Sequence, residues 1–150
     1  MKFDKPLFAI LIGILSTIPY ELFTRLLIYF GIGQYSIYNL ASLIVTINRP
    51  SLIIGSIISS LIGGLVATVF YYTLNKLGSD YLVFKGMVSG LLSWVIIEFL
   101  FTATIEGKFI PIRTVNDYYG HLLGSIIFGA IMGFMFKSFL FKEHTSMKPK

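Results

Sequence analysis

Four long and almost uncharged apolar segments decide what this chain can fold into. They cover residues 7–29, 52–74, 84–104 and 118–141. A helix needs about 20 apolar residues to cross a bilayer, because each residue adds about 1.5 Å and the hydrocarbon core is about 30 Å thick. The segments are long enough, and they lack the apolar–polar alternation of a strand. The sequence therefore predicts an all-α, polytopic transmembrane four-helix bundle that forms a single domain over residues 1–150.

The composition excludes a water-soluble protein and several kinds of cofactor site. Only 13% of the residues are charged, whereas a typical soluble domain carries about 25%. Cysteine is absent, which excludes disulfides, thiolate metal sites and iron–sulfur clusters. The two histidines are His121 and His144, and His144 lies in a Lys-rich tail, so a haem held between two intramembrane histidines is also excluded. We expect no cofactor.

The positive charges predict how the chain is oriented. With four spans, both termini lie on one side of the membrane. That side carries Lys2, Lys5, Lys76, Lys85, Lys137, Lys142, Lys148 and Lys150, and the other carries Arg49, Lys108 and Arg113. This bias predicts cytoplasmic termini in a plasma membrane. The net charge of +5 thus indicates orientation and not nucleic-acid binding.

The N-terminus resembles a signal peptide, because two lysines precede an apolar run. No small-x-small cleavage motif follows, and the apolar stretch continues to residue 30. We therefore expect an uncleaved span.

The connector over residues 31–50 is too broken to form a fifth span. It is interrupted by Gly31, Gly33, Gln34, Ser36 and Asn39. Only residues 40–47 form a clean apolar run, which is too short to cross a bilayer as a helix. We expect a short outer-face helix within residues 34–48, either interfacial or re-entrant, with Tyr35 and Tyr38 at headgroup level. Ser51 is a plausible N-cap for the second span.

Small residues at four-residue spacing predict close packing between helices. The third and fourth spans carry three such glycine pairs: Gly86 with Gly90, Gly120 with Gly124, and Gly129 with Gly133. Helices in lipid gain no hydrophobic energy by associating, so close backbone approach over small residues matters. The pairs fit packing within one bundle, an interface between copies in a homo-oligomer, or contacts in a larger membrane complex.

Four polar side chains fall within the membrane at one predicted depth. Glu21 and Glu98 each lie fourteen residues into a span that starts on the cytoplasmic side, about 21 Å along it. Arg25 lies one turn beyond Glu21, and His121 lies within a turn of the outer interface. A charge at the bilayer centre costs roughly 3 kcal/mol, so each of these groups needs a reason. Their shared depth predicts an outward-opening polar pocket.

Helical spacing adds further residues to this pocket. Glu21 and Arg25 share a face and can pair directly. The candidate lining residues are Glu21, Arg25, Trp94, Glu98, Thr102, His121 and Ser125. The two carboxylates and the histidine could ligate a divalent cation, or with Arg25 they could serve a proton relay or an anionic headgroup, so the metal content stays open.

Each candidate also has a purely structural interpretation. Glu21 and Arg25 could neutralise each other, Glu98 could be a protonated carboxyl bound to a neighbouring helix, and His121 could be interfacial. Asp117 would belong to the loop and cap the fourth helix.

Parts of the chain resemble a known family. They are the interrupted connector 30–48, the run FKGMVSGLLSW over residues 84–94, and the Gly-rich stretch 124–133. Together they resemble a family of uncharacterised small four-helix integral membrane proteins of Gram-positive-type bacteria. This resemblance implies four spans, and it brings neither an activity nor functional residues.

Three functions remain open at this point. We favour a protein whose outer pocket binds or transports a small ligand, a cation or a lipid headgroup. The alternative is a structural or accessory subunit of a membrane complex with no ligand of its own. A small membrane enzyme that uses Glu98 and His121 as acid and base is the least favoured. All three have the lipid bilayer as their surroundings.

Overall fold

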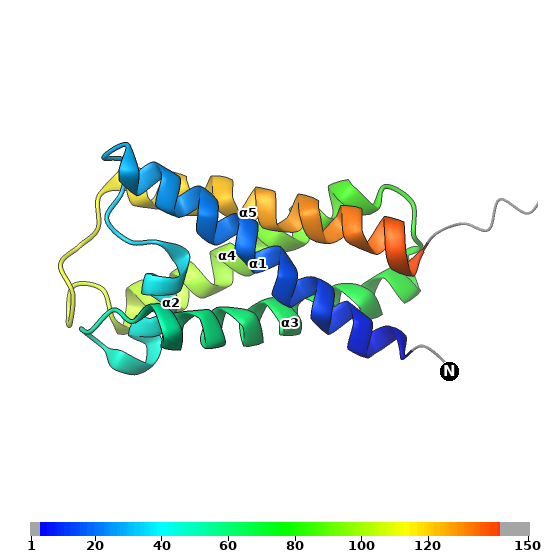
Figure 1. The fold of residues 1–150 in the computed structure, drawn as a ribbon, viewed down its shortest axis with the longest axis horizontal. Coiled ribbons are helices and arrows are strands. Elements are labelled where there is room, and N and C mark those ends of the chain that lie inside the picture. Colours follow the sequence, from blue (N-terminus) through cyan, green and yellow to red (C-terminus); the bar gives the residue numbers. More distant parts are fainter. Residues whose placement is uncertain (1–3, 142–150) are drawn as a thin grey trace, which may run out of the picture.

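The computed structural model describes residues 4–141, which form a bundle of helices (Figure 1). In chain order the elements are α1 (Lys5–Tyr29), α2 (Ile37–Thr46), α3 (Leu52–Leu77), α4 (Leu82–Thr104), α5 (Val115–Met135) and η1 (Phe136–Leu140), a π-helical continuation of α5. Some residues named above lie outside the described part of the chain: Lys2, Lys142, His144, Lys148 and Lys150.

The predicted fold class is confirmed. Four helices are long and apolar enough to cross a membrane, namely α1, α3, α4 and α5 with η1, and α2 is the expected short extra helix. The helices are longer than the apolar runs, because backbone hydrogen bonding continues through the polar residues that flank them. The third therefore begins at Leu82, the fourth at Val115, and the second continues to Leu77. Ser51 caps α3 as predicted, accepting a hydrogen bond from the Ile54 backbone N–H.

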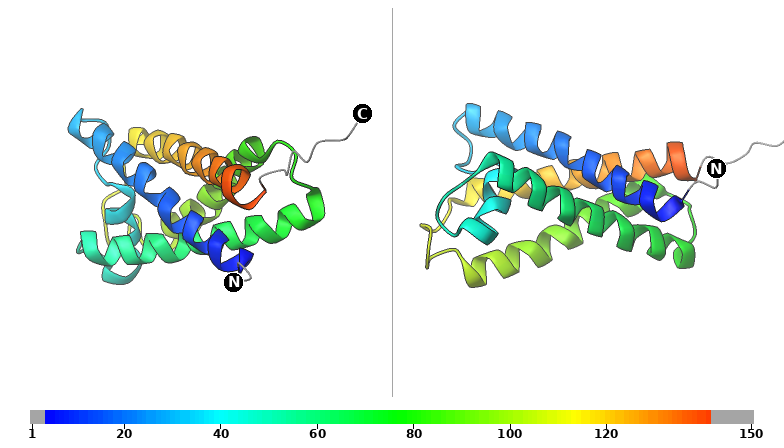
Figure 2. Two further views of the ribbon diagram at one scale, coloured as in Figure 1. Left: turned by 45° about the vertical axis from the view of Figure 1, so that its right-hand side comes forward. Right: turned by 60° about the horizontal axis from the view of Figure 1, so that its bottom comes forward.

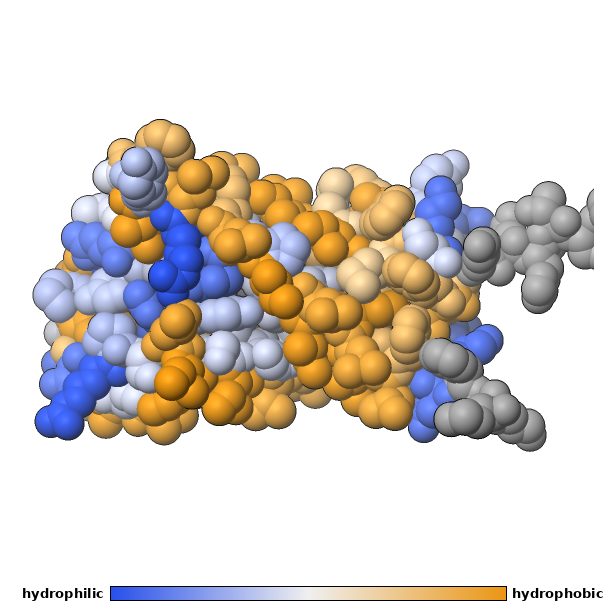
Figure 3. Space-filling view, in the orientation of Figure 1, coloured by the Kyte–Doolittle hydropathy of each residue, from blue (hydrophilic) through white to orange (hydrophobic). Residues whose placement is uncertain are grey.

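The bundle has two chemically different ends. α1 begins and η1 ends at one of them, which we call the terminal end (Figure 1). α2 and the α4–α5 connection lie at the opposite end, the loop end. On the face shown in Figure 3, hydrophobic side chains cover the middle of the molecule and hydrophilic ones gather toward both ends. This is the pattern of a surface that faces lipid in the middle and water at the ends.

The helices pair unevenly. α4 packs along α5, α1 packs along α3 and α5, and α2 packs against α3. α3 and α4 follow each other in sequence but touch only weakly, and Figure 2 shows the two diverging from each other. The bundle is therefore open between α3 and α4.

The glycines singled out in the sequence lie at helix contacts within the chain. A Cβ atom on Gly86 would meet the Gly129 carbonyl oxygen, and one on Gly90 would meet that of Ser125. Gly133 faces Leu82 in the same α4–α5 contact. On the other side of α5, Gly124 faces the Tyr20 ring of α1, and Gly120 faces Leu27. These contacts set the close approach of α5 to both neighbours.

α2 begins inside the bundle and not at its surface. Its first turn contacts Glu21 of α1, which lies eight residues, about 12 Å, before the end of that helix at Tyr29. The connector therefore dips into the bundle and α2 returns toward the loop end, which favours the re-entrant alternative over the interfacial one. The prediction that Tyr38 sits at headgroup level is wrong, because its hydroxyl lies 3.1 Å from the Thr17 hydroxyl inside the bundle.

Candidate functional site

Glu21 and Thr24 hold the N-terminus of the re-entrant helix α2. Glu21 Oε2 accepts a hydrogen bond from the Tyr38 backbone N–H at 2.9 Å, and Thr24 Oγ1 accepts one from Ile37 at 3.1 Å. The first N–H groups of a helix have no partner within it and carry a partial positive charge, so a carboxylate stabilises them. Glu21 also pairs with Arg25 at 2.5 Å, as predicted.

Asp117 holds the loop that precedes α2. Its Oδ1 accepts hydrogen bonds from the backbone N–H groups of Gln34 at 2.6 Å and Tyr35 at 3.4 Å. Irregular backbone at membrane depth is tolerated only where protein groups satisfy it. The prediction that Asp117 caps its own helix is wrong, because Thr114 holds the N-cap position and Asp117 is bound to the connector.

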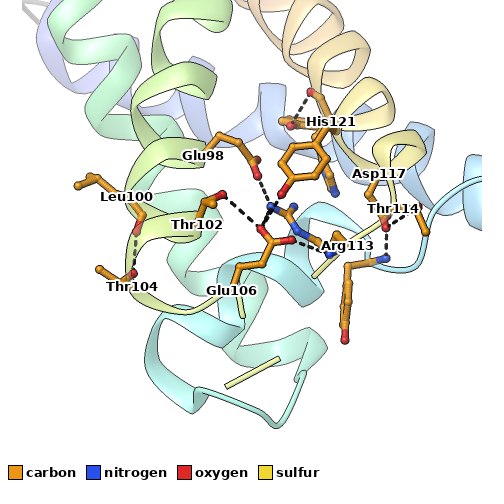
Figure 4. Close-up of polar contacts among 12 residues, drawn as sticks. Glu98, Leu100, Thr102, Thr104, Glu106, Arg113, Thr114, Asp117 and His121 are labelled. Atoms are coloured by element: carbon orange, nitrogen blue, oxygen red, sulfur yellow. Dashed lines mark hydrogen bonds and ion pairs between the residues drawn. The ribbon is translucent and has the colours of Figure 1, made fainter. Parts of the chain in front are cut away.

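A second buried network joins α4 to the loop that follows it. Arg113 Nη2 donates to Glu98 and, at 2.9 Å, to Glu106 Oε2. The Arg113 backbone N–H donates to Glu106 Oε1 at 2.6 Å, and the Tyr118 hydroxyl donates to Oε2 at 2.8 Å. Figure 4 shows both carboxylates directed at the guanidinium. Thr102 donates to Glu106 at 3.2 Å and completes the network.

Arg113 is the residue that sequence reasoning missed, since it was counted only as a loop charge. Its side chain has no exposed surface, and its guanidinium lies 5.0 Å from the Phe101 ring centroid and 4.6 Å from that of Tyr118. Both are cation–π distances. The available signal was Glu98, because an intramembrane carboxylate calls for a cationic partner and Arg113 is the nearest arginine in sequence.

Electrostatics keep this network ionised in the loop. Burial raises the pKa of Glu106, but hydrogen bonds from the Arg113 side chain and backbone and from Tyr118 outweigh it and hold the pKa at about 2. Burial lowers the pKa of Arg113, but the hydrogen bond to Glu106 and the charge of Glu98 raise it above its usual value. The cluster thus contains two carboxylates and one guanidinium, which leaves one negative charge when Glu98 is ionised.

Next to this network lies a central cavity of about 70 Å³ that all five α-helices line. Glu98, His121, Trp94 and Ser125 contribute to its wall together. His121 is 2% exposed, yet its Nδ1 has no hydrogen-bond partner among the residues that the structure describes, and the same holds for the buried Nε1 of Trp94. Such atoms are rare, because burying a polar group without a partner costs about 1–3 kcal/mol. Two residues of the cavity wall, His121 and Trp94, therefore each carry a buried nitrogen without a partner in the described part of the chain.

The structure separates the predicted pocket residues into two groups. Glu98, His121, Trp94 and Ser125 share the cavity wall, whereas Glu21, Arg25 and Thr102 do not line it. Glu21 and Arg25 are engaged at the α2 N-terminus, and Thr102 is directed toward Glu106. That the cavity residues bind a ligand stays a prediction.

The cavity favours a positively charged group over a metal ion. Its wall contains the Glu98 carboxyl and the aromatic rings of Tyr20, Trp94, Phe101 and Phe128. Carboxylates and aromatic faces both attract organic cations. Within residues 4–141, no three His, Asp or Glu side chains gather as metal ligands, so the predicted trio of Glu21, Glu98 and His121 does not form a cation site.

The four long apolar helices and the lipid-facing surface define a multi-pass membrane protein. Comparisons of the chain with protein-family models, with curated proteins and with solved structures found no match. The resemblance to small four-helix membrane proteins stays a prediction, and the function has to be argued from the cavity itself.

Proposed function

We propose that this protein binds a small primary ammonium group in the central cavity. We also propose that it spans the plasma membrane with both termini in the cytoplasm. The observation that carries the proposal is that His121 and Trp94, whose Nδ1 and Nε1 are buried without a partner among residues 4–141, line the same cavity as Glu98. An ammonium donates to a carboxylate and to a neutral imidazole nitrogen. When Glu98 is ionised, the two carboxylates around Arg113 exceed the one guanidinium and supply the opposite charge.

The cavity also limits the size of the group and adds a second requirement. Its volume of about 70 Å³ holds roughly five water-sized spheres, which suits a short amine. Trp94 Nε1 is a donor only, so it needs an oxygen acceptor. A hydroxyl next to the amine satisfies it, and a small amino alcohol therefore matches the three polar groups better than a plain amine.

Trp94 also provides the assay, because it is the single tryptophan of the chain and lies in the cavity wall. Ethanolamine and its isostere propylammonium are titrated into the protein in lipid nanodiscs while tryptophan fluorescence is followed. Ethanolamine should bind more tightly. Glu98→Gln should weaken both by about tenfold, the loss of one charge-assisted hydrogen bond of about 1.5 kcal/mol. Asp80→Asn is the matched control, since Asp80 is exposed in the α3–α4 turn.

Trp94→Phe tests the hydroxyl contact separately, with calorimetry replacing fluorescence. It should weaken ethanolamine and leave propylammonium unchanged. Absence of ammonium binding, or equal affinity in Glu98→Gln and the native protein, contradicts the proposal.

A structural or accessory role is the second candidate, and it is favoured by the charge pairing. Glu21 with Arg25, and Glu98 and Glu106 with Arg113, form ion pairs within the chain. Under this alternative the protein takes up no amine and co-purifies with a larger membrane complex. Mass spectrometry of the gently solubilised protein distinguishes the two candidates.

A further inference from the structure

A long apolar groove runs between α3 and α4, where the two helices diverge. Its volume is about 720 Å³, and it is lined by side chains such as Leu65, Val69, Val88 and Leu92. On α3 it extends from Ile62 to Leu77, a length of about 22 Å at 1.5 Å per residue. It therefore follows the helices through more than half of a hydrocarbon core about 30 Å thick.

The groove adjoins the central cavity. Four residues line both of them: Ile62, Val66, Ser93 and Ile97. The central cavity lies toward the loop end, beside Glu98 and His121. The groove extends toward the terminal end, where Phe84 and Lys85 lie in the first turn of α4. A small cavity with a few polar groups in its wall, next to a long apolar groove, suits a molecule with a polar head and an alkyl chain.

We propose that the ligand is a long-chain amine whose ammonium head occupies the central cavity and whose alkyl chain lies between α3 and α4. This inference rests on the proposed function, because it places the same ammonium group at Glu98. The cationic head is selected by charge, since two carboxylates, Glu98 and Glu106, surround the single guanidinium of Arg113. The chain enters sideways from the bilayer, because the weak contact between α3 and α4 leaves the groove open there.

An anionic lipid is the competing occupant, because Lys85 lies at the far end of the groove. However, Lys85 Nζ donates to the carbonyl oxygens of Leu77 at 3.0 Å and Gly78 at 2.9 Å. These are the last carbonyls of α3, which a lysine stabilises. The Lys85 ammonium is thus already engaged. Among residues 4–141, Glu98 is bound by Arg113 through Oε1 only, so Oε2 can still accept a hydrogen bond from an ammonium.

Lipid tails are as apolar as the groove, so enclosing the chain adds little binding energy by itself. The groove acts by shape, and an obstruction within it is the sharpest test. Leu92→Trp narrows the groove, and Leu22→Trp is its control on α1, because the two leucines are similarly exposed (60% and 62%) and Leu22 lines neither the cavity nor the groove.

Binding of radiolabelled dodecylamine and methylamine is measured in nanodiscs of zwitterionic lipid, with dodecyl sulfate as competitor. Leu92→Trp should weaken dodecylamine binding by about tenfold, or about 1.4 kcal/mol, and leave methylamine unchanged. Leu22→Trp should change neither. Methylamine binding also reports that a variant is folded; if Leu92→Trp loses it, Ser89→Leu obstructs the same groove with a smaller side chain.

The outcomes separate this inference from the function on which it rests. If methylamine binds and the groove variants bind dodecylamine normally, the chain lies elsewhere and only the long-chain inference fails. If dodecyl sulfate displaces dodecylamine and binds Glu98→Gln as tightly as the native protein, the groove holds an anionic lipid. If neither amine binds, the proposed function fails with it. Co-purification of a partner helix in the groove also overturns the inference.

Discussion

Replacing Arg113 by methionine should destabilise the protein more than most loop substitutions do. The guanidinium has no exposed side-chain surface, and its partners Glu98 and Glu106 are 11% and 2% exposed. Removing one member of a buried ion-pair network typically costs about 3–5 kcal/mol, because the remaining charges lose their compensation. The variant can also relieve an uncompensated carboxylate by protonating it, so the cost of protonation is an upper limit on the loss of stability per carboxylate. For a carboxyl with the usual pKa of 4.5, this cost is about 3.4 kcal/mol at pH 7.

Because the cost of protonating a carboxylate falls with pH, the stability deficit of Arg113→Met should depend on pH. At pH 5 the same protonation costs only about 0.7 kcal/mol. The stability deficit of Arg113→Met relative to the native protein should therefore shrink as the pH falls from 7 to 5. Reversible unfolding in mixed micelles, followed by circular dichroism, measures the deficit at both pH values.

The combined variant Arg113→Met, Glu98→Gln, Glu106→Gln should recover most of the lost stability, because amides of the same shape carry no charge. Arg113→Lys should recover little, since a lysine lacks the planar fork that serves two carboxylates. A deficit below about 1 kcal/mol for Arg113→Met at pH 7, or a triple variant as unstable as the single one, would refute the compensation of these charges.

Three further predictions concern packing, pH and orientation. Gly129→Ala should lower the thermal melting point in detergent, because the added Cβ would meet the backbone of α4. Gly64→Ala is the control: the atom nearest to its Cβ belongs to the Ile10 side chain, at 3.1 Å. It should change the melting point little, since alanine also favours the helix. The lowered pKa of about 2 means that Glu106 stabilises the fold fully above pH 4.5 and loses this effect as the pH falls toward 2; carboxyl NMR or infrared titration should show it still ionised at pH 4. A cysteine at Lys108 should react with an impermeant thiol reagent added to intact cells, and one at Asp80 should not; the reverse pattern would place the termini outside.

The sequence predicted the four spans and the extra helix because they follow from length and hydropathy alone. Glycine spacing also predicted close helix packing, although it did not indicate which helices meet. The structure places Gly86 and Gly129 where the backbones of α4 and α5 touch. These features are local or periodic, and a helix rise of 1.5 Å per residue converts them into depth. Depth correctly brought Glu98 and His121 to one level, where they share a cavity wall.

The partners of the polar groups could not be predicted, because hydropathy does not report backbone donors. Glu21 binds the first turn of α2, and Asp117 binds N–H groups of the connector, which become visible only once that segment folds inward. Arg113 reaches Glu98 because the loop after α4 turns back over the helix end. Depth alone does not determine which side chain a charge meets, since that also depends on rotation and on loop conformation.

The architecture itself narrows the choice of functional residues. A re-entrant helix at membrane depth needs acceptors for its leading N–H groups, and Glu21, Thr24 and Asp117 supply them. Arg113 and Glu106 are similarly committed to each other. Intramembrane polar residues are thus poor markers of a ligand site until these structural roles are subtracted. Four buried side-chain nitrogens stay unpaired in the described part of the chain: Arg113 Nε and Nη1, His121 Nδ1 and Trp94 Nε1. Of these, only those of His121 and Trp94 belong to residues that line the cavity with Glu98. A site inferred from unpaired polar atoms is more specific than one inferred from polarity alone. Each unpaired donor requires an acceptor on the ligand, and each unpaired acceptor requires a donor.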